Sequence, residues 1–236
     1  MVKAVLFDLD GTLLPMDQDI FTESYFKLLV RKMAPYGYEP RALIDGIWAG
    51  TAAMVKNDRV CSNEDAFWRK FADIFGEQAI GHKPLLEEFY AVDFQAAEAF
   101  CGKNPAAADA VRKIKSLGFR VALATNPIFP APATESRIRW AGLSPDDFEF
   151  YTTYETTDCC KPNPHYFLRV AERIGLDPSE CLMVGNDMSE DTVAASIGMK
   201  VFIITDCIIN KRGDDVDAYP HGGFEELVEY VKTLTE

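Results

Sequence analysis

The second half of the chain alternates between helix and strand signals, and this alternation constrains the fold more than any other feature. Asn104-Pro105 combines a helix N-cap with a proline at the first helical position, and Gly118 ends that helix. The pattern continues with expected strands at 119–125, 148–152, 181–185 and 200–205, and expected helices at 133–140, 163–174, 189–197 and 224–234. Strands that alternate with helices predict a parallel sheet with helices on both faces.

Residues 16–100 do not follow this alternation. The apolar run at residues 2–8 reads as a further strand of the same sheet, but helix signals alone follow it, at roughly 20–34, 40–56, 63–75 and 83–94. Ser62 and Asp65 give a capping signal for the third helix. We therefore expect an α/β core of residues 1–15 and 101–236, interrupted by a helical module of residues 16–100. The many aromatic residues of the module are interpreted as its core, with one or two left to line a substrate pocket.

Composition excludes several classes of partner. The chain has 236 residues and a net charge of −13, which argues against nucleic acid because phosphate backbones need a basic footprint. No apolar stretch approaches the ~20 residues of a membrane span. No signal peptide is visible, and the six cysteines lack paired C-x-x-C spacing. These features predict a cytoplasmic protein with reduced thiols, no zinc site and no membrane partner.

Two carboxylates follow the first strand, in Phe7-Asp8-Leu9-Asp10-Gly11-Thr12. Strand side chains alternate between faces, so Asp8 and Asp10 can point the same way, and Gly11 permits a sharp turn. The two negative charges repel each other, which is costly unless they serve a function. They could bind a hard cation, or one could act as a nucleophile and the other as an acid/base. Taken alone, the segment is equally compatible with a solvated Asp-Gly turn.

Polar residues also follow three other expected strands. In open parallel sheets, ligands bind beyond the carboxyl ends of the strands. Each feature alone could be a turn, a surface lysine or a loop, but together they predict one site. With Asp8 and Asp10 after the first strand, the predicted site then comprises Thr125 and Asn126, Lys161, and Asn186, Asp187 and Asp191.

The ordered set of motifs resembles that of the haloacid dehalogenase-like (HAD) hydrolase superfamily. The motifs read Asp8-Leu9-Asp10-Gly11-Thr12, Thr125-Asn126, Lys161-Pro162-Asn163-Pro164, and Gly185-Asn186-Asp187 with Asp191. The resemblance covers the whole chain in order and spacing. It implies a Rossmann-like parallel sheet core, and it implies that the helical module of residues 16–100 is an inserted cap domain of the family's first class.

The resemblance also assigns catalytic roles. Asp8 would be the nucleophile that forms an aspartyl-phosphate, and Asp10 would protonate the leaving oxygen and then activate water. Thr125, Asn126 and Lys161, together with Thr12 of the first motif, would bind the phosphoryl group of the substrate.

A magnesium ion is the cofactor that the resemblance implies. It would be held by the Asp8 carboxylate, the Asp10 backbone carbonyl and a carboxylate of the fourth motif. Many relatives have Gly-Asp where this chain has Gly185-Asn186. Either Asp187 supplies the carboxylate, with Asp191 as its outer partner, or Asn186 is a neutral oxygen ligand. The first alternative is favoured, and both are retained.

The resulting hypothesis is a Mg²⁺-dependent phosphomonoester hydrolase that acts on a small phosphorylated metabolite. Asp10 argues against the metal-independent dehalogenase branch, which lacks this acid/base. A phosphosugar mutase of the same fold and a catalytically silent phosphate-binding regulatory protein are the alternatives. The sequence leaves open the identity of the phosphomonoester and the choice between monomer and homodimer.

Overall fold

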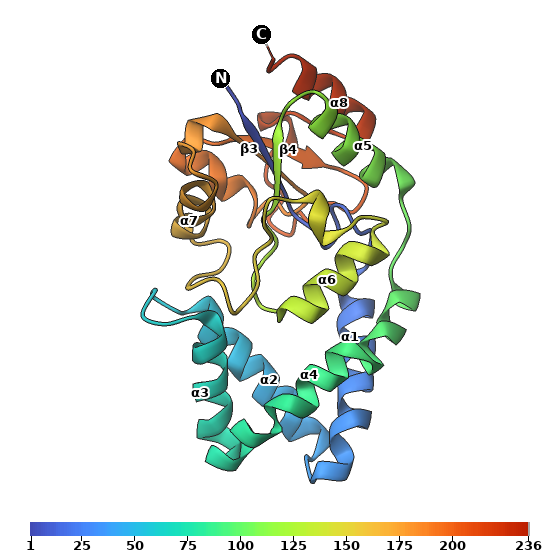
Figure 1. The fold of residues 1–236 in the computed structure, drawn as a ribbon, viewed down its shortest axis with the longest axis vertical. Helices are drawn as coiled ribbons and strands as arrows, with labels where there is room; N and C mark the ends of the chain where they lie inside the picture. Colours follow the sequence, from blue (N-terminus) through green and yellow to red (C-terminus); the bar gives the residue numbers. More distant parts are fainter. Residues whose placement is uncertain (236) are drawn as a thin grey trace.

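A computed structural model describes residues 1–235, which form a sheet-containing half and a helical half (Figure 1). Five parallel strands make the sheet, in the order β2-β1-β3-β4-β5. The strands are β1 (Ala4–Phe7), β2 (Arg120–Leu123), β3 (Cys181–Gly185), β4 (Lys200–Ile204) and β5 (His221–Gly222). The predicted parallel α/β fold is confirmed.

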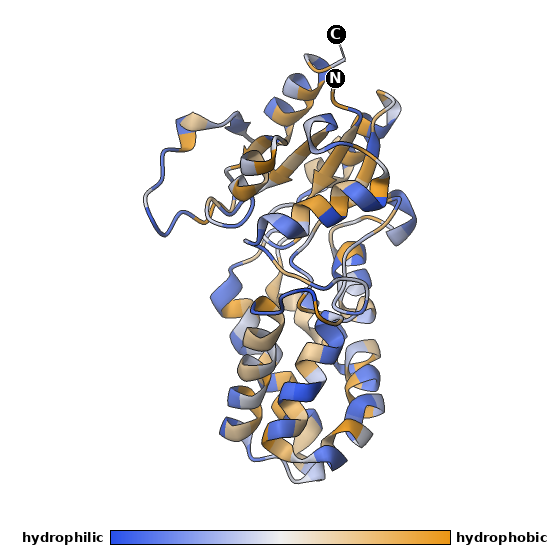
Figure 2. Ribbon diagram, turned by 90° about the vertical axis from the view of Figure 1, so that its left-hand side faces the viewer, coloured by the Kyte–Doolittle hydropathy of each residue, from blue (hydrophilic) through white to orange (hydrophobic). Residues whose placement is uncertain are grey.

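Alternate residues of each strand pack into two separate layers of core. On β1, Val5 and Phe7 pack in the layer under α5 (Pro105–Ser116) and α8 (Phe224–Lys232). Ala4 and Leu6 pack in the layer under α7 (Pro164–Ile174). Helices therefore cover both faces of the sheet, and the central strands β1 and β3 are buried throughout, in the hydrophobic layer that Figure 2 shows.

The helical half comes entirely from the chain between β1 and β2. Its helices are α1 (Gln18–Met33), α2 (Pro40–Val55), α3 (Asn63–Phe75) and α4 (Lys83–Ala91), followed by a 3₁₀ helix at Asp93–Phe100. In Figure 1 they lie beyond one end of the sheet, while both termini lie at the opposite end. Phe71, Phe89 and Phe94 are fully buried among them, as expected of an aromatic core. Within residues 1–235, no helix is long and apolar enough to cross a membrane.

Three predicted helix starts carry the expected caps. The side chain of Asn104 accepts a hydrogen bond from Ala106 N at 3.1 Å, and that of Asn163 accepts one from His165 N at 3.0 Å. Ser62 accepts one from Asp65 N at 3.0 Å. These caps satisfy amide groups that have no partner inside the helix, which fixes where α5, α7 and α3 begin.

Two predicted elements differ in the structure. The segment 148–152 runs beside β2 but forms only a single-residue bridge, between Leu123 and Tyr151. The predicted helix at 189–197 is a 3₁₀ helix over Thr192–Ile197. Its first turn is lost because Asp187 Oδ1 accepts hydrogen bonds from Ser189 N and Glu190 N, which replaces a helical start with a side-chain turn.

Candidate active site

The carboxyl ends of three adjacent strands bring the predicted site residues together. Asp8 N donates to Val184 O of β3 at 2.8 Å, and Ala124 N donates to Phe7 O of β1 at 2.7 Å. The residues just beyond β2, β1 and β3 therefore lie side by side. Thr125, Asp8 and Asn186 line one common cavity, and Asp10, Asn126, Asp187 and Asp191 line it too.

Lys161 links two of the carboxylates. Its Nζ donates to Asp8 Oδ1 at 2.9 Å and to Asp191 Oδ1 at 2.6 Å, and only 1% of the lysine is exposed. Burial acts to lower the pKa of Lys161, but Asp191 and Asp8 outweigh burial and raise that pKa well above its ordinary value. The lysine is therefore a permanent cation at the centre of the site.

Burial acts on both carboxylates bound to this lysine. It raises the pKa of Asp8, with the negative charge of Asp10 adding to the shift and Lys161 opposing it. It likewise raises the pKa of Asp191, to about 6, again against the effect of Lys161. One lysine thus compensates only part of the negative charge gathered here, which favours a further cation at the site.

Arg137 of α6 (Ala131–Trp140) is a site residue that sequence reasoning missed. It is fully buried, and its Nη1 forms an ion pair with Asp10 Oδ2. Its Nε donates to Ala133 O at 3.2 Å, and its guanidinium lies 4.3 Å from the centre of the Phe129 ring. The other carboxylate oxygen, Asp10 Oδ1, is buried without a partner in the described chain. Arg137 therefore holds Asp10 by one oxygen and leaves the other available.

Glu190 is a second residue that the sequence did not indicate. It accepts a hydrogen bond from Asn126 Nδ2 at 3.0 Å, while Asn126 Oδ1 is buried without a partner among residues 1–235. Burial raises the pKa of Glu190 to about 7. The contact fixes the amide of Asn126 at the rim of the cavity. No motif marked this glutamate, because it stands among other acidic residues of a loop.

The two alternatives for the fourth motif have different surroundings. Asp187 Oδ1 accepts hydrogen bonds from Ser189 N and Ser189 Oγ, both at 2.7 Å. This oxygen is therefore engaged within its own loop. Asn186 is 1% exposed, and its Oδ1 lies 3.0 Å from Thr12 Oγ1. Gly11 lets the two loops meet, because its φ is +82° and a Cβ there would lie 2.3 Å from Asn186 Nδ2.

The oxygen atoms near Thr12 fit a hard divalent cation. Thr12 Oγ1 lies 3.1 Å from Asp8 Oδ2 and 3.0 Å from Asn186 Oδ1, but a hydroxyl has one proton and can donate to only one of them. One oxygen is left with unused acceptor capacity. Among residues 1–235, no three His, Cys, Asp or Glu side chains form a metal-binding group. An ion here would have the Asp8 carboxylate and the Asn186 amide oxygen as ligands, both of them hard oxygen donors.

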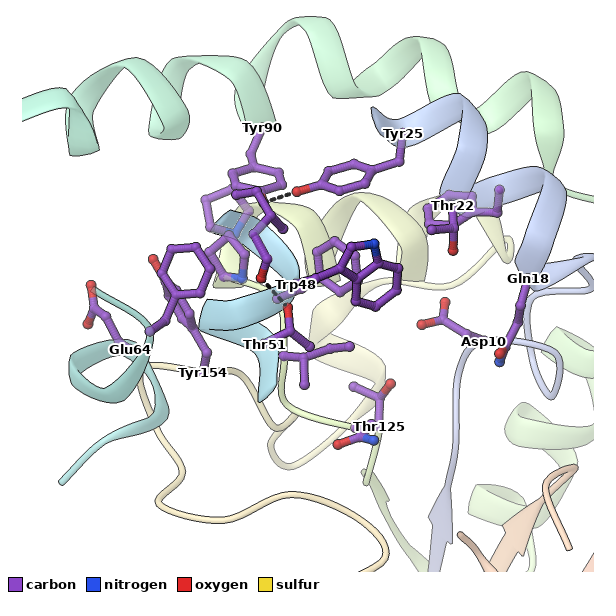
Figure 3. Close-up of a pocket in the computed structure, with 18 of the residues that line it drawn as sticks. Asp10, Gln18, Thr22, Tyr25, Trp48, Thr51, Glu64, Tyr90, Thr125 and Tyr154 are labelled. Carbon is purple, nitrogen blue, oxygen red and sulfur yellow. Dashed lines mark hydrogen bonds between the residues drawn. The ribbon is translucent and has the colours of Figure 1, made fainter. Parts of the chain in front are cut away.

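A cavity of about 520 Å³ extends from these residues to the helical half. Figure 3 shows Asp10 and Gln18 at one side of it and Glu64 and Tyr154 at the other, with Trp48 between them and Thr125 below Trp48. Helices α1 to α4 supply most of the lining on the far side. The site is thus built from both halves of the molecule.

A family model described as haloacid dehalogenase-like hydrolase matches residues 2–198. A glyceraldehyde 3-phosphate phosphatase from Methanothermobacter thermautotrophicus is 26% identical over 226 residues, which cover 92% of each chain. A phosphoglycolate phosphatase from Salmonella typhi is 27% identical over 213 residues, covering 84% of this chain and 79% of that one. The crystal structure of a HAD phosphatase from Thermococcus onnurineus superimposes with a TM-score of 0.60 at 22% identity, covering 98% of both chains.

Proposed function

The chain belongs to the haloacid dehalogenase-like hydrolase family, and from this premise we propose that it is a metal-dependent phosphatase that cleaves phosphomonoesters through an aspartyl-phosphate on Asp8. The observation that carries the proposal is the pairing of Lys161 with Asp8 Oδ1 at the end of β1, at 2.9 Å, beside a cavity that Asp10 also lines. The relatives named above act, by their names, on two different small phosphomonoesters.

The first step is the attack of Asp8 on the phosphorus atom. A carboxylate oxygen of Asp8 forms the new P–O bond while the bond from phosphorus to the alcohol oxygen breaks. Asp10 gives its proton to the departing alcohol, and we assign this transfer to Oδ1, the oxygen that Arg137 leaves free. In the second step, Asp10 takes a proton from water, which attacks the aspartyl-phosphate and releases phosphate and free Asp8.

The remaining rim residues bind and compensate charge. Lys161 is positioned to offset the negative charge of the phosphoryl group, and the Thr125 hydroxyl and Asn126 amide line the same end of the cavity. Bound Mg²⁺ would supply the positive charge that lets the Asp8 carboxylate and the phosphate approach each other. We assign its side-chain ligands to Asp8 and Asn186, with Asp191 holding Lys161 and the 186–187 backbone in place.

We further propose that residues 16–100 act as a cap over a core of residues 1–15 and 101–236. The chain leaves and re-enters the core at one place, because Met16 and Cys101 form an antiparallel bridge and Gly102 N donates to Pro15 O at 2.6 Å. Such a paired connection suits a hinge that opens for substrate and closes to exclude water.

Phosphate release from an aryl phosphate, measured with and without Mg²⁺, tests the proposal. We expect turnover that chelation abolishes and Mg²⁺ restores. Asp8→Asn should keep the fold but lower kcat more than a hundredfold, or about 2.7 kcal/mol, because an amide cannot attack phosphorus. Full activity after verified removal of metal, or a variant above that limit, would contradict the proposal. A mutase would instead isomerise a sugar phosphate with little net release, and a silent binding protein would release none.

A further inference from the structure

The part of the cavity beyond the rim is mainly aromatic. Its volume of about 520 Å³ falls within the ~300–1,000 Å³ of sites that enclose drug-sized ligands. Trp48 is 52% exposed although it lines this cavity, so its ring is open to a ligand (Figure 3). The other aromatic lining residues are Phe21, Tyr25, Phe26, Phe67, Trp68, Tyr90, Phe129 and Tyr154.

Positive charge is scarce on this lining. In the described part of the chain, Lys83 is the only lysine or arginine that lines the cavity. Its Nζ already forms an ion pair with Glu64, and Glu87 and Glu155 line the cavity as well. The hydrogen bond to Glu64 is the main cause that raises the pKa of Lys83. The region beyond the rim therefore carries excess negative charge and no cation without a partner.

The cavity lining also contains a buried hydrogen-bond donor, the indole N–H of Trp68. Trp68 is 8% exposed and lines the cavity, and its Nε1 has no well-aligned acceptor among residues 1–235, although the Tyr154 hydroxyl lies next to it. An unpaired buried donor costs free energy unless a ligand or water accepts from it. This donor comes from α3, which also supplies Phe67 to the aromatic lining.

We propose that this cavity selects phosphomonoesters whose alcohol carries an uncharged aromatic group and disfavours those with a second anionic group. The proposal rests on the proposed phosphatase function and adds a substrate class to it. Aromatic rings of the substrate would stack against or meet edge-on the rings of the lining. A second carboxylate or phosphate would lie near Glu87 and Glu155 and would lose its hydration without gaining a cation.

The test compares substrates that differ only in the group away from phosphorus. Benzyl phosphate and 4-carboxybenzyl phosphate share the ring and the reacting bond, and only the second carries an additional anion. Phosphoglycolate supplies the anion without the ring. With the Mg²⁺-loaded full chain, we expect kcat/KM for benzyl phosphate to exceed both others at least tenfold.

Two variants and a control connect that preference to the lining. Glu64→Gln removes the partner of Lys83, so the advantage of benzyl over 4-carboxybenzyl phosphate should fall at least threefold. Trp48→Ala should lower kcat/KM for benzyl phosphate about tenfold and affect phosphoglycolate less. Val92→Ala, at an exposed position of the helical half outside the cavity lining, should change neither ratio.

Calorimetric titration with benzylphosphonate and 4-carboxybenzylphosphonate measures the same preference without turnover. Equal rates for the three substrates, or a preference for either anion, would overturn the inference while leaving the phosphatase function intact. Phosphonate binding in the expected order without any phosphate release would overturn the proposed function and leave the binding preference standing. Absence of both release and ordered binding would overturn both.

Discussion

Arg137 shows how one buried side chain can decide what a catalytic carboxylate does. Arg137→Met would leave Asp10 without its cation, so Asp10 could move away from the cavity or bind a competing cation. We expect kcat to fall at least tenfold with a smaller change in KM, and the pH dependence of kcat to shift. Arg137→Lys should recover part of the loss because it keeps the charge but not the planar donor group.

A matched control lies on the same helix. Arg139 is exposed and pairs with Glu135, so Arg139→Met should leave kcat and its pH profile unchanged. If Arg137→Met behaved like this control, the positioning role of Arg137 would be wrong. A thermal melt of each variant separates lost positioning from lost stability.

The fourth motif gives a second residue-level prediction. The sequence favoured Asp187 as the metal ligand. In the structure Asp187 Oδ1 accepts hydrogen bonds from its own loop, whereas Asn186 Oδ1 lies beside Thr12 Oγ1, which is also close to Asp8 Oδ2. We therefore expect Asn186→Ala to weaken Mg²⁺ binding more than Asp187→Ala, and Asn186→Asp to strengthen it. Titration of activity with Mg²⁺ measures the order, and a larger effect at Asp187 would return the ligand role to that residue.

Glu190 predicts a pH dependence of stability. Burial raises its pKa from an ordinary 4.5 to about 7, so the folded protein keeps a proton that the unfolded chain loses. The folded protein therefore has its full stability at this residue below about pH 4.5. As the pH rises through about 7, the buried carboxyl must lose its proton, and this stability is lost. Glutamine cannot ionise, so Glu190→Gln should not lose this stability at high pH. Relative to the wild type, the variant should gain more free energy of unfolding at pH 8 than at pH 5, by at most about 3 kcal/mol. Urea unfolding in chelator measures this, and an unchanged pH dependence would contradict it.

At the scale of elements, the start of α3 is fastened to the core through Asn63. This residue is fully buried, its N donates to Thr157 O at 2.8 Å, and its Oδ1 accepts from Asn57 Nδ2 at 3.0 Å. Its Nδ2 lies within hydrogen-bond distance of four core atoms, Pro127 O, Thr157 Oγ1, Cys159 O and Cys160 Sγ. The helical half is therefore attached to the core through α3 as well as through its two chain connections.

Asn63→Ala tests this anchor. Loss of the side chain leaves buried groups unsatisfied, and we expect the free energy of unfolding to fall by about 2–3 kcal/mol. Amide hydrogen exchange at residues 63 and 64 should also become faster. Ser62→Ala, which removes only the helix cap, should cost about 1 kcal/mol and serves as the comparison. Equal effects of the two variants would show that Asn63 contributes no more than a cap.

At the scale of the whole molecule, the helical half supplies both the substrate pocket and a cover for the core. Tyr25 packs on Phe129 with ring centres 5.6 Å apart, and Phe94 packs on Trp140 at 5.2 Å. Replacing residues 18–100 with a short linker would expose these core rings, so Phe129→Ser and Trp140→Ser should accompany the deletion to keep the core soluble.

We expect this shortened protein to cleave benzyl phosphate slowly and to lose its discrimination between benzyl phosphate and phosphoglycolate. The binding energy that distinguishes them lies in the removed lining. The full chain with the same two serine substitutions is the control. An unchanged ranking in the shortened protein would place specificity in the core instead of the helical half.

The sequence by itself determined the parts of this protein that depend on short-range physics. Residues such as Asn104 and Asn163 cap their helices through contacts two residues away, so the pattern of caps, glycines and apolar spacing located α5 and α7. The rule that parallel strands present their carboxyl ends at one edge then brought Asp8, Thr125 and Asn186 to a common site. The segment 189–197 was predicted less well, because the preceding Asp187 accepts hydrogen bonds from Ser189 N and Glu190 N in place of a helical first turn.

Only the tertiary structure decided which side chains complete the site. Arg137 and Asp10 are 127 residues apart in the chain, and a helical arginine is normally solvated, so nothing local marks it as buried and paired. The same holds for Asn63, and for the aromatic residues that line the cavity while they also form part of the core. Burial and pairing are properties of the space between elements, and that space exists only once the helical half is packed against the sheet.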